Sequence, residues 1–169
     1  MNTLLTMRAE KAVGDIQELT GNFPKEHWHT PPSYGGWSAA EVSEHIIKAS
    51  TGLPHLLNGN TIACDREPAE KIAVIESIFL DYSQKLQSPD FLVPSGKMEK
   101  EEAVTAWKNI KEEFIAATQI PDLTRICADR ELPRMGTLTR LEWLNFCLTH
   151  LQRHTHQLKN ISADFQHKP

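Results

Sequence analysis

Apolar residues recur with a helical period through most of this chain, and that period restricts the folds open to it. Residues three or four apart share one face of an α-helix, and five segments show apolar residues at this spacing. The segments cover about residues 2–19, 38–50, 69–86, 100–118 and 139–161. No segment alternates convincingly as a half-buried strand does. We therefore expect an all-α fold, a bundle of four main helices plus one extra helix, as a single domain over residues 1–169.

Glycine and proline residues separate these segments. Gly21 and Pro24 end the first, and a loop of sequence HWHTPPSYGGW follows. Pro121 stops the fourth segment, and residues 122–136 are expected to be irregular. His27 and His29 lie in the Pro-rich loop, where we expect them to be solvated, although such a loop could cap a pocket.

The second helical segment has a well-defined start. Ser38 is a good N-cap residue and Glu41 follows three positions later, which is the pattern of a capping box. Trp37 precedes the cap and Val42 occupies the fourth helical position, as in a hydrophobic staple. We interpret Trp37 first as a core residue and second as part of a pocket wall.

Composition excludes several classes of protein. The 169 residues are 40% hydrophobic and 24% charged, and the net charge is −4 without a basic run, so nucleic acid is a poor candidate as a partner. The three cysteines are far apart, which argues against a disulfide framework and a thiolate zinc site. No stretch approaches the roughly 20 apolar residues of a membrane span, and the first residues lack a signal-peptide pattern. We expect a cytoplasmic protein with no membrane partner.

Histidine placement is the main indication of function. On a helical wheel, the fifth segment places His150 and His154 among apolar residues, one turn apart on the inner face, and places His156 toward water. The apolar stripe beside them comprises Leu141, Leu144, Leu148, Leu151 and Leu158. The same construction turns His45 inward on the second segment, and it turns Glu44 and Glu142 outward.

Three inward imidazoles without partners would cost several kcal/mol, and one shared divalent metal would remove that cost. The alternative is that each is a core histidine bonded to a backbone carbonyl. Cys147 lies one turn before His150, and we interpret it as a small buried hydrophobe that borders the site rather than as a ligand. Gln157 either reaches the site or makes a structural hydrogen bond.

Two stretches of this sequence resemble signatures of the DinB/YfiT-like superfamily. WSAAEVSEHI, residues 37–46, resembles the stretch in which a tryptophan and a helix cap precede an inward metal histidine. GTLTRLEW, residues 136–143, resembles the family pattern G-x-L-T/S-x-x-E-W, and HLQRHTHQL, residues 150–158, resembles H-x-x-x-H-x-x-Q-L. The resemblance extends over the whole chain in the order of its helices.

The resemblance implies a four-helix bundle in up-down-down-up order, with 69–86 as a helix inserted between the second and third bundle helices. It implies that His45, His150 and His154 hold one divalent metal, with zinc and nickel the usual metals of the family. Many members carry a further histidine where this chain has Arg153, so a fourth histidine ligand is in doubt here. Members often form homodimers, so a second copy of this chain is a candidate partner.

Three functions remain open from the sequence. Three protein ligands leave a coordination position for water or substrate, which is typical of a catalytic site. Family members resemble thiol S-transferases, which implies a small-molecule substrate such as a low-molecular-weight thiol. Other members resemble hydrolases, but the wheels provide no inward carboxylate as a base. The third possibility is a non-catalytic, stress-related binding module that keeps the metal for stability.

Overall fold

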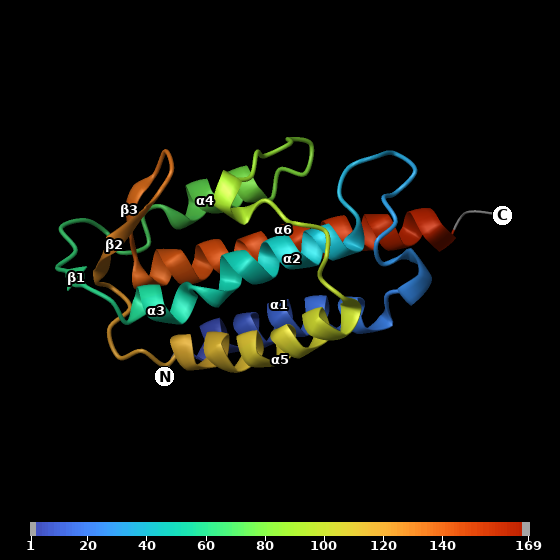
Figure 1. Ribbon diagram of the computed structural model, residues 1–169. Helices are drawn as coiled ribbons and strands as arrows, with labels where there is room; N and C mark the ends of the chain where they lie inside the picture. The colour runs from blue at the N-terminus through green and yellow to red at the C-terminus, as the bar shows by residue number, and fades with distance from the viewer. Residues whose placement is uncertain (1–2, 167–169) are drawn as a thin grey trace.

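Four long helices form the body of the protein, so the fold is rich in helix, as expected. The computed structural model describes residues 3–166, so residue 2, where the first helix was expected to begin, lies outside the described residues. The long helices are α1 (Thr3–Asn22), α2 (Ala39–Thr51), α5 (Lys100–Ala117) and α6 (Arg140–Gln166). In Figure 1, α1 and α6 run in one direction and α2 and α5 in the other. Helix α1 packs on α5 and α6, and α2 packs on the same two helices.

The remaining helices are short and lie in the connections. They are α3 (Leu53–Leu57), α4 (Ile72–Phe79) and two 3₁₀ turns, η1 (Lys25–His27) and η2 (Asp90–Leu92). Helix α4 packs against α6, as Figure 1 shows. It stands where the extra helix was expected, between the second and third long helices, but it is much shorter than the predicted 69–86.

Helix α4 ends at Phe79 because other groups bind the backbone beyond it. The Arg153 guanidinium donates hydrogen bonds to the carbonyls of Phe79, Asp81 and Gln84. A continuing helix would need those carbonyls for its own amides. The Asp81 carboxylate also accepts a hydrogen bond from the Ser83 amide at 3.1 Å, which favours a turn.

A small antiparallel sheet makes the all-α prediction wrong. Strands β1 (Thr61–Ile62), β2 (Ile126–Leu132) and β3 (Gly136–Thr139) lie in the order β1-β2-β3 at one end of the helices (Figure 1). Thr61 pairs with Cys127, and Leu132 pairs with Gly136 across the hairpin. Most of β2 is exposed, so its residues lack the alternation that marks a strand in sequence. Strand pairing, rather than an apolar face, therefore holds this segment extended.

Reciprocal capping boxes fix the starts of α2 and α6. In α2, the Glu41 amide donates to Ser38 Oγ at 3.3 Å and the Ser38 amide donates to Glu41 Oε2 at 2.8 Å, which confirms the predicted box. In α6, the Thr139 amide donates to Glu142 Oε2 at 2.9 Å and the Glu142 amide donates to Thr139 Oγ1 at 3.1 Å. These boxes set where each helix begins, and hence which residues face inward.

Helix α6 is covered on more than one side, so the outward placement of Glu142 is wrong, whereas Gln152 and Asn160 farther along the helix are exposed. Glu142 was expected to face water, but it is buried, as are Asn145 and Thr149 on the same side of the helix. Helix α4 packs against α6, and Arg8 of α1 donates to Asn145 Oδ1 at 2.9 Å. Apart from Ile126, the buried apolar residues of the described chain form one cluster. None of the helices within residues 3–166 is long and apolar enough to cross a membrane.

Candidate metal centre

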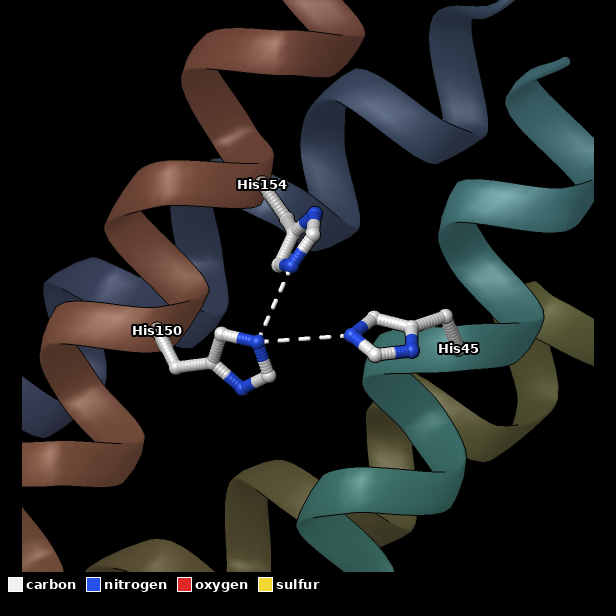
Figure 2. A group of neighbouring side chains, drawn as sticks. All are labelled: His45, His150 and His154. Atoms are coloured by element: carbon white, nitrogen blue, oxygen red, sulfur yellow. Dashed lines mark hydrogen bonds between the residues drawn. The ribbon is translucent and has the colours of Figure 1, made fainter. Parts of the chain in front are cut away.

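His45, His150 and His154 meet in the interior between α2 and α6 (Figure 2). His150 Nε2 lies 3.4 Å from His45 Nε2 and 3.0 Å from His154 Nε2. The three residues are only 4%, 8% and 7% exposed in the order His45, His150, His154, so water does not solvate them freely. The structure thus brings together the three histidines that the sequence singled out.

Local helix geometry explains this meeting. His150 and His154 are four residues apart on α6, so their side chains project from the same face. His45 lies on the face of α2 that also buries Val42 and Ile46, and α2 packs against α6. Two helices that bury their apolar faces against one another therefore also bring their histidines together.

His45 and His154 each use Nδ1 for a hydrogen bond away from the cluster, which leaves Nε2 of each ring available to a metal. His45 Nδ1 lies 3.0 Å from the Leu92 carbonyl oxygen, and His154 Nδ1 lies 2.9 Å from Gln157 Oε1. Both oxygens can only accept, so each Nδ1 carries the hydrogen and each Nε2 presents a lone pair to the centre. Metal-bound histidines in proteins are held in this way by an acceptor on the second nitrogen.

The donor set fits a divalent cation. A tetrahedral site with nitrogens at about 2.0–2.1 Å from the metal has nitrogen–nitrogen edges of about 3.3–3.4 Å. The two Nε2–Nε2 distances at His150, 3.4 and 3.0 Å, are near that value, and the ligand nitrogens of the three residues all lie within 4.8 Å of one another. Without a cation, a hydrogen on His150 Nε2 would lie between two lone pairs, whereas a cation would bind all three nitrogens at once. His45, His150 and His154 therefore could hold a metal ion.

Burial keeps these imidazoles neutral. It is the main cause that lowers the pKa of His45, and it lowers the pKa of His150 well below the ordinary 6.5. The pKa of His154 falls to about 3, first through burial and then through the neighbouring His45, while the bond to Gln157 acts in the opposite direction. Neutral imidazole is the form that binds metals.

The metal-free protein should lose stability as the pH falls from about 7 to about 5. In the unfolded chain these histidines take up protons near 6.5, whereas the folded chain resists protonation until its lowered pKa values are reached. The unfolded state then binds more protons, and each extra proton lowers the free energy of unfolding by about 1.4 kcal/mol per pH unit. Urea unfolding in EDTA at about pH 7, 6 and 5 measures this slope. An equal free energy of unfolding at all three pH values would contradict this prediction.

Aromatic side chains surround the cluster. The Trp37 ring lies 5.1 Å from the His45 ring, centroid to centroid, and the Phe146 ring lies 5.5 Å from the His150 ring and nearly parallel to it. Phe79, at the end of α4, packs edge-on against His150 at 5.7 Å. Trp37 thus lies beside the site and also packs, partly buried, against the hydrophobic core. Phe146 was missed, although its position four residues before His150 on one helix face could have indicated it.

The other two predicted pocket residues have different positions. Gln157 binds His154 directly, as described above, so it orients a possible ligand. Cys147 is buried, burial raises the pKa of its thiol to about 12, and it does not join the cluster of possible ligand atoms. The Leu92 carbonyl was missed, because nothing in a sequence marks a backbone oxygen as the partner of a distant histidine.

Two carboxylates that were expected to face water are buried instead. Glu44 accepts hydrogen bonds from the Ser95 and Gly96 amides, both at 2.9 Å, and pairs with Lys48 at 2.7 Å. Although burial acts to raise its pKa, the bonds from Lys48 and Ser95 bring it to about 2. Glu142 is paired with Arg66. Within residues 3–166, the cluster of possible ligand atoms includes no carboxylate and no thiolate.

The Pro-rich loop reaches both helices of the site. His29 is exposed as expected, but His27 is half-buried and its ring stacks on Phe165 at 4.3 Å. The Ser33 amide donates to the Asp164 carboxylate of α6 at 2.8 Å, and the loop then leads to Trp37. The loop is therefore tied to the end of α6, and its last residue, Trp37, lies beside His45.

Comparison with known proteins gives a family match and no individual relative. No curated protein and no solved structure matches the chain. The model of the DinB superfamily matches residues 8–158, which include all three histidines, all of α2 and α6 as far as Leu158. The chain belongs to the DinB superfamily.

Proposed function

We propose that this protein binds one divalent metal ion, zinc or nickel, through His45, His150 and His154. The observation that carries the proposal is the arrangement of the Nε2 atoms, which converge while Leu92 and Gln157 hold the hydrogens of the outer rings on Nδ1. Imidazole nitrogens suit zinc, nickel, iron and copper, and zinc and nickel are the metals that the family resemblance favours.

We further propose that the protein with its metal bound is an enzyme that acts on a small molecule. Three protein ligands are typical of catalytic sites, because structural sites fill all four positions with protein groups. A divalent cation would supply a positive charge that lowers the pKa of an approaching thiol or water molecule. The chain itself holds the three imidazoles neutral and packs Trp37, Phe79 and Phe146 against them, which keeps bulk water away.

A thiol S-transferase is the reaction that we favour. The transfer forms a sulfur–carbon bond and releases a leaving group, and a thiol with a lowered pKa already supplies the nucleophile. Hydrolysis of an ester or amide would instead need a base close to the metal. Glu44 and Glu142 are the buried carboxylates nearest in sequence to the histidines, and their oxygens are bonded to Ser95, Gly96, Lys48 and Arg66. This makes hydrolysis the weaker alternative.

The test is a thiol-dependent reaction with a chlorinated nitrobenzene, in which the aryl–sulfur bond forms and chloride leaves. We expect the metal-loaded protein to exceed the metal-stripped protein by at least about 10-fold, because three-ligand sites act through the bound cation. The metal-loaded protein should react only when a thiol is present, and several low-molecular-weight thiols are tested. The rate of His154→Ala should equal that of the metal-stripped protein. Equal rates in all samples would reject the transferase. Hydrolysis of nitrophenyl esters by the same samples would favour a hydrolase, and a metal-dependent melting temperature without turnover would favour the binding module.

A further inference from the structure

The connection between α4 and α5, residues 80–99, crosses the metal centre; we call it the strap. Figure 1 shows it running in yellow-green from α4 past α6 and α2 to α5. Its Leu92 carbonyl accepts the hydrogen of His45 Nδ1 at 3.0 Å, and Ser88 Oγ lies 3.4 Å from the same nitrogen. The orientation of one possible ligand therefore depends on where this connecting segment and its short 3₁₀ turn η2 lie.

Arg153 of α6 anchors the first part of the strap. Its Nη1 donates to the Phe79 carbonyl at 3.0 Å and to the Asp81 carbonyl at 3.1 Å, and its Nη2 donates to the Gln84 carbonyl. A guanidinium carries its donors in a fixed fork, so these bonds fix the direction in which the chain leaves α4. Arg153 directly precedes His154.

Glu44 of α2 anchors the last part of the strap. Its carboxylate accepts from the Ser95 amide, the Ser95 hydroxyl at 3.1 Å and the Gly96 amide. Lys48, which pairs with Glu44, also donates to the Val93 carbonyl at 3.4 Å. Glu44 directly precedes His45. Leu92 thus lies between two anchors, each of which is the chain neighbour of a histidine in the cluster.

Apolar burial does little to hold the strap. Leu86, Phe91 and Val93 are 39%, 70% and 49% exposed, so these large apolar side chains are not locked into the core. Hydrogen bonds from charged groups are stronger than neutral ones, and here they occur at both ends of the segment. Leu92 and Met98 are only partly buried, so the polar anchors contribute much of what holds the position of the Leu92 carbonyl.

We propose that Arg153 and Glu44 are positioning residues of the metal centre, which hold the strap at its two ends so that the Leu92 carbonyl orients His45. This inference rests on the proposed metal binding and adds to it a connecting segment outside the long helices. Groups that bind the second nitrogen of a ligand histidine typically change metal affinity by about 10- to 100-fold. Loss of either anchor should have an effect in that range.

The test compares Arg153→Gln with Arg140→Gln. Arg140 is a matched control, because it is also on α6 and also donates to backbone carbonyls, those of Leu57 at 2.7 Å and Asp122 at 3.0 Å, at the end of α6 where the sheet lies. Zinc affinity is measured by competition with a chromophoric chelator. We expect affinity about 10-fold weaker in Arg153→Gln and in Glu44→Gln, and unchanged in Arg140→Gln.

Hydrogen–deuterium exchange and the visible spectrum of cobalt-loaded protein provide readouts that general destabilisation would not produce. Strap amides should exchange faster in Arg153→Gln and Glu44→Gln while α1 and α5 stay protected, and the cobalt spectrum should change. Arg153→Lys, which keeps the charge but not the fork, should be intermediate, and Glu44→Gln serves if Arg153→Gln does not fold. Wild-type affinity in the anchor variants, or equal weakening in Arg140→Gln, would overturn the inference. Wild-type protein that binds no zinc would instead reject the metal site itself.

Discussion

Replacing His150 with alanine should reduce bound divalent metal from about one equivalent per chain to nearly none. His150 Nε2 is the nitrogen that lies close to both other Nε2 atoms, so its loss leaves two imidazoles from different helices without the atom between them. Two-ligand sites hold such ions weakly, and the effect should exceed the roughly 10- to 100-fold change that follows loss of a group behind a ligand. His45→Ala should behave in the same way, because it removes the only contribution of α2 to the cluster.

Metal content is measured by mass spectrometry on protein purified without a histidine tag, before and after incubation with Zn²⁺ or Ni²⁺. His156→Ala is the matched control, because His156 lies two residues beyond His154 on the same helix but stacks on Tyr82 at 4.0 Å outside the cluster. It should retain the wild-type metal content. A His150→Ala protein that is folded and fully loaded would show that the site uses other ligands. A wild type that takes up no metal would leave the three residues as core histidines.

Replacing Glu142 with alanine should lower the free energy of unfolding by about 3–5 kcal/mol. The side chain is fully buried and makes a two-pronged pair with Arg66, from Nη1 to Oε1 at 2.7 Å and from Nη2 to Oε2 at 2.6 Å. It also accepts the Lys71 amide at 2.9 Å and the Thr139 amide at 2.9 Å. Its removal leaves a largely buried guanidinium and two amides without their acceptor.

Glu102 offers a matched control for that variant. It occupies the same third position in the capping box of α5, where it accepts the Glu99 amide at 2.9 Å, but it is exposed. Water can replace it, so Glu102→Ala should cost no more than about 1 kcal/mol. Urea unfolding at neutral pH measures the free energy of unfolding of both variants. Equal costs would show that the cap, and not the buried pair with Arg66, is what Glu142 contributes.

The histidine cluster was the most predictable part of this protein. Spacing along one helix puts His150 and His154 on a common face, and amphipathic periodicity turns that face and His45 inward. Both inferences need only local geometry. That the two helices would be neighbours came from the family resemblance, because periodicity does not say which helices pack together.

The outward placement of Glu44 and Glu142 was wrong because their burial depends on contacts between distant segments, which local geometry does not contain. A helical wheel assigns any polar arc to water, but α6 contacts α4 as well as α1 and α2. Arg66 and the strap supply the hydrogen-bond donors that allow these carboxylates to be buried. Those donors lie far away in the sequence, so no local pattern indicates them.

The sequence by itself determined the long helices, the start of α2 at Ser38 and the three inward histidines, because each follows from side-chain periodicity or capping within a few residues. Only the tertiary structure decided the sheet, the end of α4 at Phe79 and the position of the strap. Strand β2 is extended because it pairs with β1 and β3, and α4 stops where Arg153 binds its carbonyls. Hydrogen bonds between distant segments set these features, and such bonds exist only after the helices have packed.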